Sequence, residues 1–185
     1  MASSTSTLQL ALLAVLLATS TSAVLAASGN GKPTRIRLYV HEKFEGANAT
    51  VASPLLRSPL GANATFGEPG VIDDELRTGP HRSSELVGKF QGFFIGTDMS
   101  GPSYLATVTV VFTAGERRGS TLTVQGNYHF DFDGAPIERA VVGGTGVFRM
   151  ARGYSVMKAV NAPTPETVVF RIDMFVLMPP RGQYY

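Results

Sequence analysis

The stretch YLATVTVVFTAGERRGSTLTVQGNYHF, residues 104–130, decides how this chain folds. Its first part is rich in β-branched residues, as a strand buried on both faces would be. Its second part alternates, so that Val124 and Tyr128 share one side of an extended chain. Between the two parts, Gly115 and Gly119 frame the charged tip GERRG. This pattern predicts two antiparallel strands joined by a hairpin turn.

The same alternation continues on both sides of this hairpin. Large apolar residues occupy one face of RIRLYVHEKF (35–44), ELVGKFQGFFIG (85–96) and TVVFRIDMFVLM (167–178). Turn signals such as Ser-Gly-Pro at 100–102 separate these segments, and no helix is long enough to cross over between strands. Seven or eight such strands predict an all-β antiparallel barrel or sandwich. We favour the barrel because closure removes exposed strand edges.

The two ends of the 185-residue chain differ from its middle. Residues 1–27 carry no charged side chain and centre on LQLALLAVLLA, which predicts a secretory signal peptide rather than a membrane span. We assign 28–34 to a short linker, 35–178 to one barrel domain and 179–185 to a tail. The protein is therefore expected to be secreted.

Composition excludes several classes of function. The chain has no cysteine, which rules out thiol catalysis and thiolate metal sites and leaves stability to the core. With only three histidines we expect no metal site, and no cofactor is implied. The net charge is +2 and Arg117–Arg118 is the only adjacent basic pair, so we expect no nucleic-acid partner. Given export, the sequons at Asn48 and Asn63 are candidate N-glycosylation sites in an exposed loop region.

The glycine-rich stretch VVGGTGVFRMARGY, residues 141–154, poses the question of phosphate binding. A phosphate loop needs a helix directly after its glycines, and Gly153 argues against one here. Neither glycine fingerprint of nucleotide-binding loops is present. We expect a turn between a strand at 137–142 and a strand at 147–158.

This same stretch resembles the signature of the plant dirigent proteins. LYVHEKFEG (38–46) is similar to the family's N-terminal strand, whose His-Asp centre is His41-Glu42 here, and VGKFQGFFIGTDMSG (87–101) is similar to a second family strand. The similarity extends over residues 35–178. It implies an eight-stranded antiparallel barrel of the allene-oxide-cyclase type that assembles as a homo-oligomer, a dimer or trimer, and is secreted and glycosylated.

The resemblance also implies a function. Dirigent proteins have no oxidising centre: a separate laccase or peroxidase makes phenoxy radicals from monolignols such as coniferyl alcohol, and the barrel orients them so that coupling gives one stereoisomer of a lignan. We therefore expect a non-oxidising auxiliary protein that supplies selectivity through orientation. Some relatives act on quinone methides, where pocket acids transfer protons.

Glu42 is the candidate catalytic residue. It shares a strand face with Leu38, Val40 and Phe44, which is a poor place for a carboxylate unless that face lines a pocket. Burial would raise its pKa and make it an acid or a hydrogen-bond acceptor for a phenol. The alternative is a carboxylate near the barrel mouth that is solvated or paired with a basic residue.

Three aromatic residues on apolar faces, Phe94, Tyr128 and Phe170, are the candidate substrate-binding residues. Core packing is the default for such rings, but inside a barrel they would offer stacking surfaces to phenols. His41 should point away from Glu42, and Arg152 is expected to satisfy backbone or carboxylate groups rather than bind substrate. Asp131 and Asp133 flank a turn and are expected to be solvated.

The sequence departs from the pattern of pinoresinol-forming dirigents. Those have tyrosines at the positions of Phe94 and Gly96, an aspartate at Tyr128 and an arginine at Ile137. A pocket without two phenols, one carboxylate and one guanidinium is expected to make another product. Three hypotheses remain open: a guide for radical coupling, a cyclase or quinone-methide enzyme that uses Glu42, and a carbohydrate-binding or wall-structural defence protein.

Overall fold

The computed structural model describes residues 31–129, 135–160 and 164–178. Every strand belongs to one compact unit, Pro33–Tyr185, and Met1–Lys32 forms a separate unit. The predicted signal peptide, Asp131, Asp133 and the tail after Met178 lie outside the described residues.

Within the described residues, nine strands and two short 3-10 turns follow one another. The strands are β1 (Thr34–Lys43), β2 (Val51–Ala52), β3 (Pro69–Arg77), β4 (Leu86–Gly96), β5 (Ser103–Phe112), β6 (Thr121–His129), β7 (Ile137–Thr145), β8 (Arg152–Ala159) and β9 (Thr167–Leu177). The turns are η1 (Gly115–Arg117) and η2 (Gly146–Phe148). The predicted GERRG hairpin tip is confirmed by η1, which joins β5 to β6.

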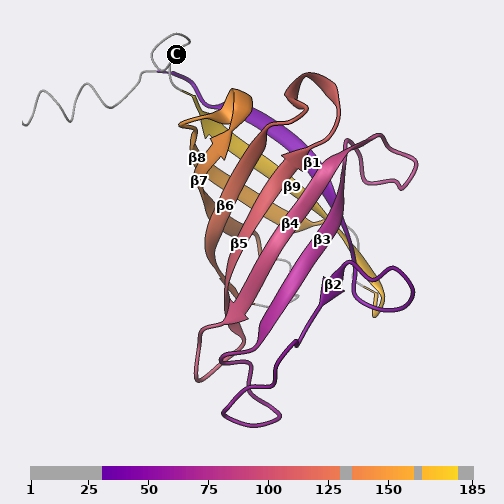
Figure 1. The fold of residues 1–185 in the computed structure, drawn as a ribbon, viewed down its shortest axis with the longest axis vertical. Helices are drawn as coiled ribbons and strands as arrows, with labels where there is room; N and C mark the ends of the chain where they lie inside the picture. The colour runs from indigo at the N-terminus through magenta and orange to yellow at the C-terminus, as the bar shows by residue number, and fades with distance from the viewer. Residues whose placement is uncertain (1–30, 130–134, 161–163, 179–185) are drawn as a thin grey trace, which may run out of the picture. The chain divides into compact units, whose positions relative to one another are not determined.

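Eight of these strands close into an antiparallel barrel, which confirms the predicted fold (Figure 1). The order around the wall is β1-β9-β8-β7-β6-β5-β4-β3, and the pairing of β1 with β3 completes the ring. The two-residue strand β2 pairs only with β3 and stands outside the ring. Closure leaves the long strands without a free edge.

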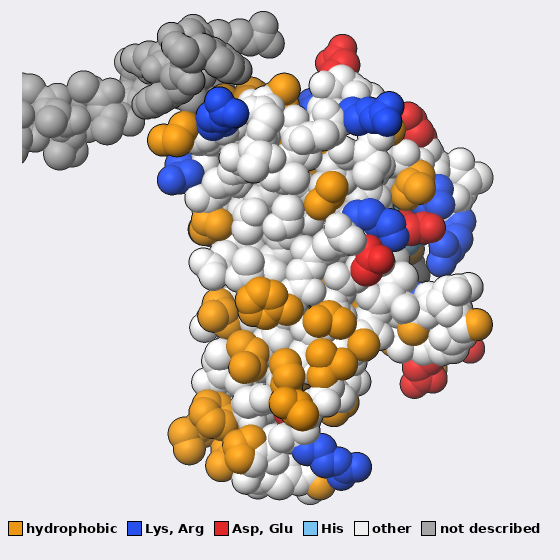
Figure 2. All heavy atoms as spheres, in the orientation of Figure 1, with side chains coloured by type: hydrophobic (Ala, Val, Ile, Leu, Met, Phe, Trp, Pro, Cys, Tyr) orange, Lys and Arg blue, Asp and Glu red, His pale blue; other side chains and the backbone are white. Residues whose placement is uncertain are grey.

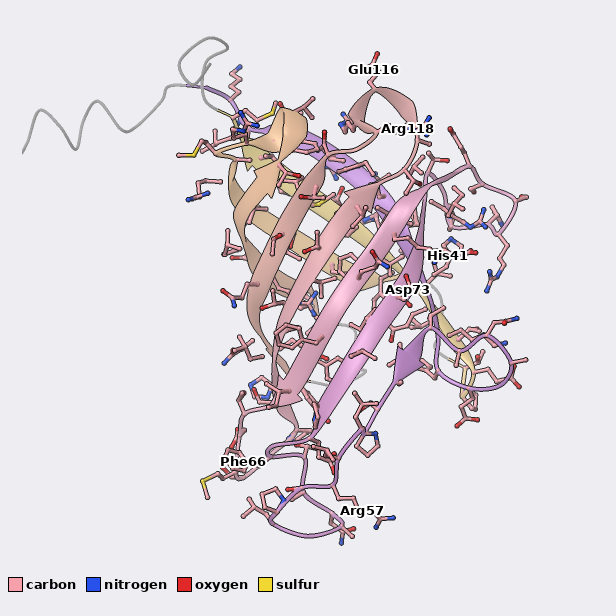
Figure 3. All side chains as sticks on the ribbon, viewed as in Figure 1. His41, Arg57, Phe66, Asp73, Glu116 and Arg118 are labelled. Atoms are coloured by element: carbon pink, nitrogen blue, oxygen red, sulfur yellow. The ribbon has the colours of Figure 1, made fainter. Side chains whose placement is uncertain are left out.

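Alternation along each strand builds the core, because every second side chain points inward. Val40, Leu76, Val108, Val124 and Ile172 are fully buried, and each contributes about 1.5–3 kcal/mol through burial. Near η1 and η2 the interior is closed by Phe112 and Phe148, whose ring centroids lie 5.4 Å apart. Figure 3 shows Glu116 and Arg118 beyond this end of the wall, and Phe66 and Arg57 beyond the other.

Two details of the strands differ from expectation. β5 is buried on one face only, because its outer residues such as Thr107 are half-buried. Gly143 and Gly144 belong to β7, and β8 begins only at Arg152, so the connection between them is longer than expected and lies later in the chain. Gly146 opens that turn with φ +60°, and a side chain there would collide with Ser120.

Candidate active site

Closure of the barrel brings two carboxylates together on its inner wall. In the pairing of β1 with β3, Val40 lies opposite Leu76 and His41 opposite Glu75. The next position in this register places Glu42 opposite Asp74, on the inner face that Val40 and Leu76 share. The structure thus puts Glu42 where the sequence predicted it, and adds a second carboxyl group that sequence reasoning missed.

The Asp74 side chain is fully buried, and its two oxygens have different partners. Oδ1 accepts a hydrogen bond from Thr50 Oγ1 at 2.5 Å. Within the described part of the chain no N–H or hydroxyl donor reaches Oδ2, and Asp74 is also hydrogen-bonded to the Glu42 carboxyl, a bond that we assign to Oδ2 because Thr50 holds Oδ1. Two carboxyl groups form a hydrogen bond only when one of them carries a proton. The two residues therefore form a carboxyl pair that shares a proton.

The surroundings decide which member holds that proton. Burial, and then the charge of Glu42, raise the pKa of Asp74 to about 9 although Thr50 donates to it. Burial raises the pKa of Glu42 to about 7, against the hydrogen bond from Asp74 and the charge of Arg139. The proton thus stays on Asp74 while Glu42 titrates near neutral pH, where a general acid or base is most effective.

A buried guanidinium faces the carboxyl pair. Arg139 of β7 is only 5 % exposed, and its charge acts on Glu42. Its guanidinium carbon lies 4.9 Å from the centroid of the Tyr128 ring, and Nη1 lies 4.0 Å from the Met157 sulfur. Burial lowers the pKa of Arg139, while Tyr128 and Glu42 favour its charge. Arg139 therefore supplies a poorly solvated positive charge beside Glu42.

Aromatic rings continue the site from Arg139. Tyr128 stacks on Tyr104 with centroids 5.5 Å apart, and Phe94 meets Tyr104 edge-on at 5.6 Å. Phe94, Tyr128 and Phe170 keep 8 %, 9 % and 9 % of their surface exposed, whereas Val108 of the deeper core keeps none. The three predicted rings thus lie on the inner face with some accessible surface, and Tyr104 is a fourth that was not predicted.

The departures at Phe94, Gly96, Tyr128 and Ile137 stand, but other inner positions supply groups of the same kind. Tyr104 lies opposite Gly96 and touches Phe94, so a phenol is present beside both positions that lack one. Asp74 supplies the second carboxyl group. Arg139 supplies the guanidinium that was expected to be absent because Ile137 stands at the family's position.

The signal for the missed residues was of the kind that singled out Glu42. In VIDDELR, Asp74 alternates with Ile72 and Leu76, and in IERAVV, Arg139 alternates with Ile137 and Val141. In all three segments, a charged residue at a position where the alternation calls for an apolar one marks a side chain that faces inward.

Several other candidates lie away from the carboxyl pair. His41 is buried in the outer layer of the wall, where its Nε2 lies 3.1 Å from the Gly79 carbonyl oxygen and burial lowers its pKa. Arg152 is exposed and donates to the Ala151 carbonyl at 2.8 Å, as a backbone-satisfying role requires. Asn48 and Asn63 are exposed in the loops before and after β2.

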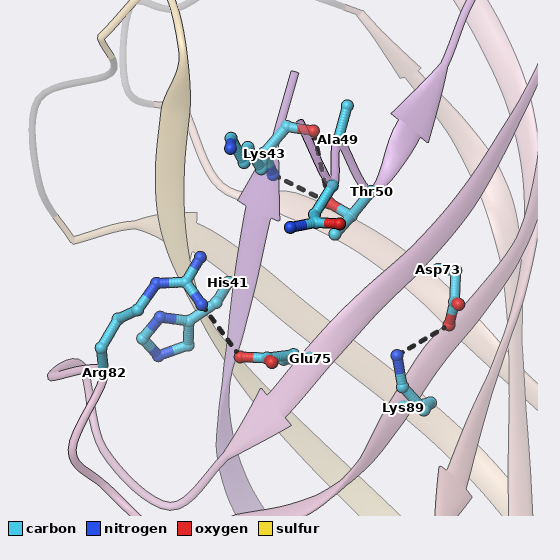
Figure 4. Close-up of a pocket in the computed structure, with 9 residues that line it drawn as sticks. His41, Lys43, Ala49, Thr50, Asp73, Glu75, Arg82 and Lys89 are labelled. Carbon is cyan, nitrogen blue, oxygen red and sulfur yellow. Dashed lines mark hydrogen bonds and ion pairs between the residues drawn. The ribbon is translucent and has the colours of Figure 1, made fainter. Parts of the chain in front are cut away.

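A pocket of about 460 Å³ opens on the outer side of the same wall (Figure 4). It is lined by His41, Lys43, Asn48, Ala49, Thr50, Asp73, Glu75, Arg82 and Lys89. Its charges are largely paired: Lys89 lies 3.3 Å from Asp73, and Arg82 lies 3.1 Å from Glu75. No Phe or Tyr side chain is among its lining residues, so the carboxyl pair inside the barrel is the stronger candidate for an active site. Thr50 lines the outer pocket and is also hydrogen-bonded to Asp74 of the carboxyl pair.

Two further kinds of feature bear on function. Among residues 31–129, 135–160 and 164–178 no group of three or more acidic or histidine side chains is placed to hold a metal ion. The same residues include no helix that is long and apolar enough to cross a membrane.

Comparison with known proteins gives consistent matches. The family model described as dirigent-like protein matches residues 33–177. Dirigent protein 1 of Arabidopsis thaliana is 35 % identical over 139 residues, which is 75 % of each chain. Pterocarpan synthase 1 of Glycyrrhiza echinata is 32 % identical over 150 residues, 78 % of each chain. The solved structure of the pterocarpan synthase dirigent protein PsPTS1 superposes with a TM-score of 0.69 at 31 % identity and covers 80 % of this chain and 97 % of its own.

Proposed function

The chain belongs to the dirigent family, and we propose that it is an acid–base enzyme of that family, acting on a closed-shell phenolic alcohol that loses water and closes a ring. The observation that carries this proposal is the buried carboxyl pair Glu42–Asp74, because orienting radicals requires no proton-sharing acids. Two relatives of this chain are named pterocarpan synthases, and the word synthase supports an enzymatic role for this chain as well.

The proposed reaction needs no oxidant. Glu42 in its protonated form gives a proton to the hydroxyl group on the carbon next to the substrate ring, and that group leaves as water. The ring phenol releases its proton to water, so that the electron pair of its O–H bond forms the quinone methide. A second hydroxyl of the substrate then adds to the electrophilic carbon, its proton passes to the quinone-methide oxygen so that the ring phenol is restored, and Glu42 takes up a proton from water. The net change is loss of one water.

The other inner side chains have matching tasks. Arg139 stabilises the negative charge of ionised Glu42 and of a phenolate near it. The rings of Phe94, Tyr104, Tyr128 and Phe170 hold the planar substrate by stacking. Since the leaving group and the attacking hydroxyl are held in one orientation, the product forms with one handedness.

The test is turnover of such an alcohol without any oxidase. Wild-type protein should form the cyclised product with an enantiomeric excess, and Asp74→Asn should lower the rate. Asp73→Asn is the matched control, because Asp73 is the neighbour of Asp74 on the outer face, where it pairs with Lys89. Failure of the wild-type protein with a panel of phenolic alcohols would contradict the proposal.

A second candidate is stereoselective coupling of monolignol radicals made by a laccase or peroxidase. The partly accessible rings favour it, since orientation of two planar phenols needs only such surfaces. Its test is chiral analysis of coniferyl alcohol products formed by a laccase with and without the protein. If the protein guides radical coupling, Glu42→Gln should keep the enantiomeric excess. If the protein is an acid–base enzyme, the same substitution should abolish turnover of the phenolic alcohol.

The proposal includes a homo-oligomer. Hydrophobic side chains gather on one outer face of the barrel (Figure 2). In the outer face of β3, β4 and β5, Val71 pairs with Phe93 and Ile95 with Leu105, and Phe93 is 54 % exposed. A second copy would cover this apolar surface. Sedimentation should show a dimer or trimer that Phe93→Asp dissociates.

Export and glycosylation complete the proposal. The apolar segment at 1–27 and the exposed positions of Asn48 and Asn63 support a secreted glycoprotein. Expression in plant cells should give protein in the medium that begins near residue 28 and loses mass on deglycosylation. Full-length protein retained inside the cell would contradict it.

A further inference from the structure

We propose that Thr50 relays protons through the barrel wall, from the outer pocket to the carboxyl pair, and so resupplies Glu42 after each turnover. This inference rests on the acid–base function proposed above. It arises from one residue that touches both sides of the wall: Thr50 lines the outer pocket (Figure 4), and its hydroxyl is hydrogen-bonded to Asp74.

The hydrogen bonds around Thr50 leave a place for a proton donor. A hydroxyl has one donor and two acceptor sites. The donor goes to Asp74 Oδ1 at 2.5 Å rather than to the more distant Lys43 carbonyl oxygen at 3.4 Å, and one acceptor site takes the backbone N–H of Lys43 at 2.8 Å. The second acceptor site remains for a water molecule of the outer pocket, which Thr50 lines.

The hydrogen bonds of this relay all donate toward the inside of the barrel. Thr50 donates to Asp74 Oδ1, and the proton on the other side of Asp74 is donated to Glu42. Delivery of one proton therefore consists of three short transfers. A proton from pocket water binds Thr50 Oγ1, the hydroxyl proton of Thr50 moves to Asp74 Oδ1, and the Oδ2 proton of Asp74 moves to ionised Glu42. A half-turn of the Asp74 carboxyl then restores the starting arrangement.

Among the described residues, Asp74 has no further hydrogen-bond partner through which it could exchange protons with solvent. Asp74 is fully buried, and its two contacts are Glu42 from β1 and Thr50 from the loop between β1 and β2. The charges that act on the pair are Asp73 beside it in the chain and Arg139 from β7. When substrate fills the inner face beside Glu42, the Thr50 side is the remaining path to solvent.

The experiment measures proton exchange at Asp74 without substrate. The C=O stretch of the protonated carboxyl, identified by its loss in Asp74→Asn, is followed by infrared spectroscopy after mixing into D2O. All proteins carry Glu42→Gln, which removes exchange through the inner side. They also carry Asn48→Gln, because replacing Thr50 would otherwise remove the sequon as well.

In this background Thr50→Ser should exchange as fast as the threonine protein, and Thr50→Val should exchange at least about tenfold more slowly. Backbone amide exchange in the same samples must be equal, so that local opening does not explain the difference. Equal carboxyl exchange in the serine and valine proteins would overturn the relay. If the valine protein does not fold, Thr50→Ala replaces it, and exchange as fast as in the serine protein would overturn the relay. Failure of turnover in the oxidase-free assay would instead overturn the proposed function.

Discussion

Two aspartates in this barrel are almost equally buried and have opposite electrostatic states. Asp173 of β9 is 5 % exposed on the outer face, and Asp74 of β3 is fully buried on the inner face. Asp173 accepts hydrogen bonds from Arg37 at 2.8 Å and Arg35 at 3.0 Å, and Arg171 lies 3.1 Å away. Burial alone would raise the pKa of Asp173, but these arginines outweigh it and lower the pKa. Asp74 faces a hydroxyl and another carboxyl group, and its pKa is raised.

The comparison separates a structural carboxylate from a reactive one. Asp173 is ionised and compensated at neutral pH, so it ties β1 to β9. Asp74 is neutral and lends its proton to Glu42. Burial by itself therefore does not identify a functional carboxyl group; the partners that the neighbouring strands place opposite it do.

The largest expected effect is on catalysis. Glu42→Gln keeps the size of the side chain and a hydrogen bond with Asp74 but cannot transfer a proton. We expect the rate of cyclisation to fall about 10²–10⁴-fold with the fold intact. The control is Asp173→Asn, which removes a carboxylate that is only 5 % exposed and should keep most of the rate. A similar loss in both variants would break the comparison.

The next effect is on the pH dependence of stability. The raised pKa values of Glu42 and Asp74 mean that the folded state keeps protons that the unfolded state has lost, so stability should fall as pH rises from about 4 to about 9. Asp74→Asn should flatten this decline by about 1 kcal/mol per pH unit. Urea denaturation at a series of pH values measures it. A slope unchanged by Asp74→Asn would contradict the shared proton.

Asp173 should show the opposite sign. Its lowered pKa contributes stability that is present at neutral pH and lost as pH falls below its usual value of 3.8. Asp173→Asn should therefore cost about 1–2 kcal/mol at neutral pH, whereas Asp74→Asn should cost little or stabilise above about pH 8. Thermal denaturation of the two variants side by side checks this. Equal losses would mean that both aspartates are structural.

The smallest expected effect concerns the stability contributed by the arginines around Asp173 on the outer face. The Arg35 side chain is 50 % exposed and is one of three arginines around Asp173. Arg35→Ala should cost only about 0.5 kcal/mol at low salt and less at high salt, because exposed ion pairs are screened. Denaturation at two ionic strengths measures it. A salt-independent loss above about 1.5 kcal/mol would show that Arg35 acts by packing on Phe175 instead.

Much of the site could be predicted from alternation. Glu42, Phe94, Tyr128 and Phe170 were placed on the inner face by counting every second residue, and the structure puts them there. The same count would place Arg139 inward as well, whereas no strand was expected around Asp74, so its alternation with Ile72 and Leu76 was missed. Tyr104 was missed because the segment YLATVTVVF has apolar or β-branched residues at both sets of alternating positions, so its inward face could not be told from its outward face.

The sequence by itself determined the long strands other than β3, the hairpin at GERRG and which side chains of those strands face inward, because these follow from a period of two within each segment. Only the tertiary structure decided which inward-facing groups meet. Glu42 and Asp74 form a pair because β1 closes the ring on β3, and Thr50 reaches Asp74 because the loop after β1 folds against the same seam. Closure is set by the strands of the whole barrel together, so these contacts leave no mark in any single segment.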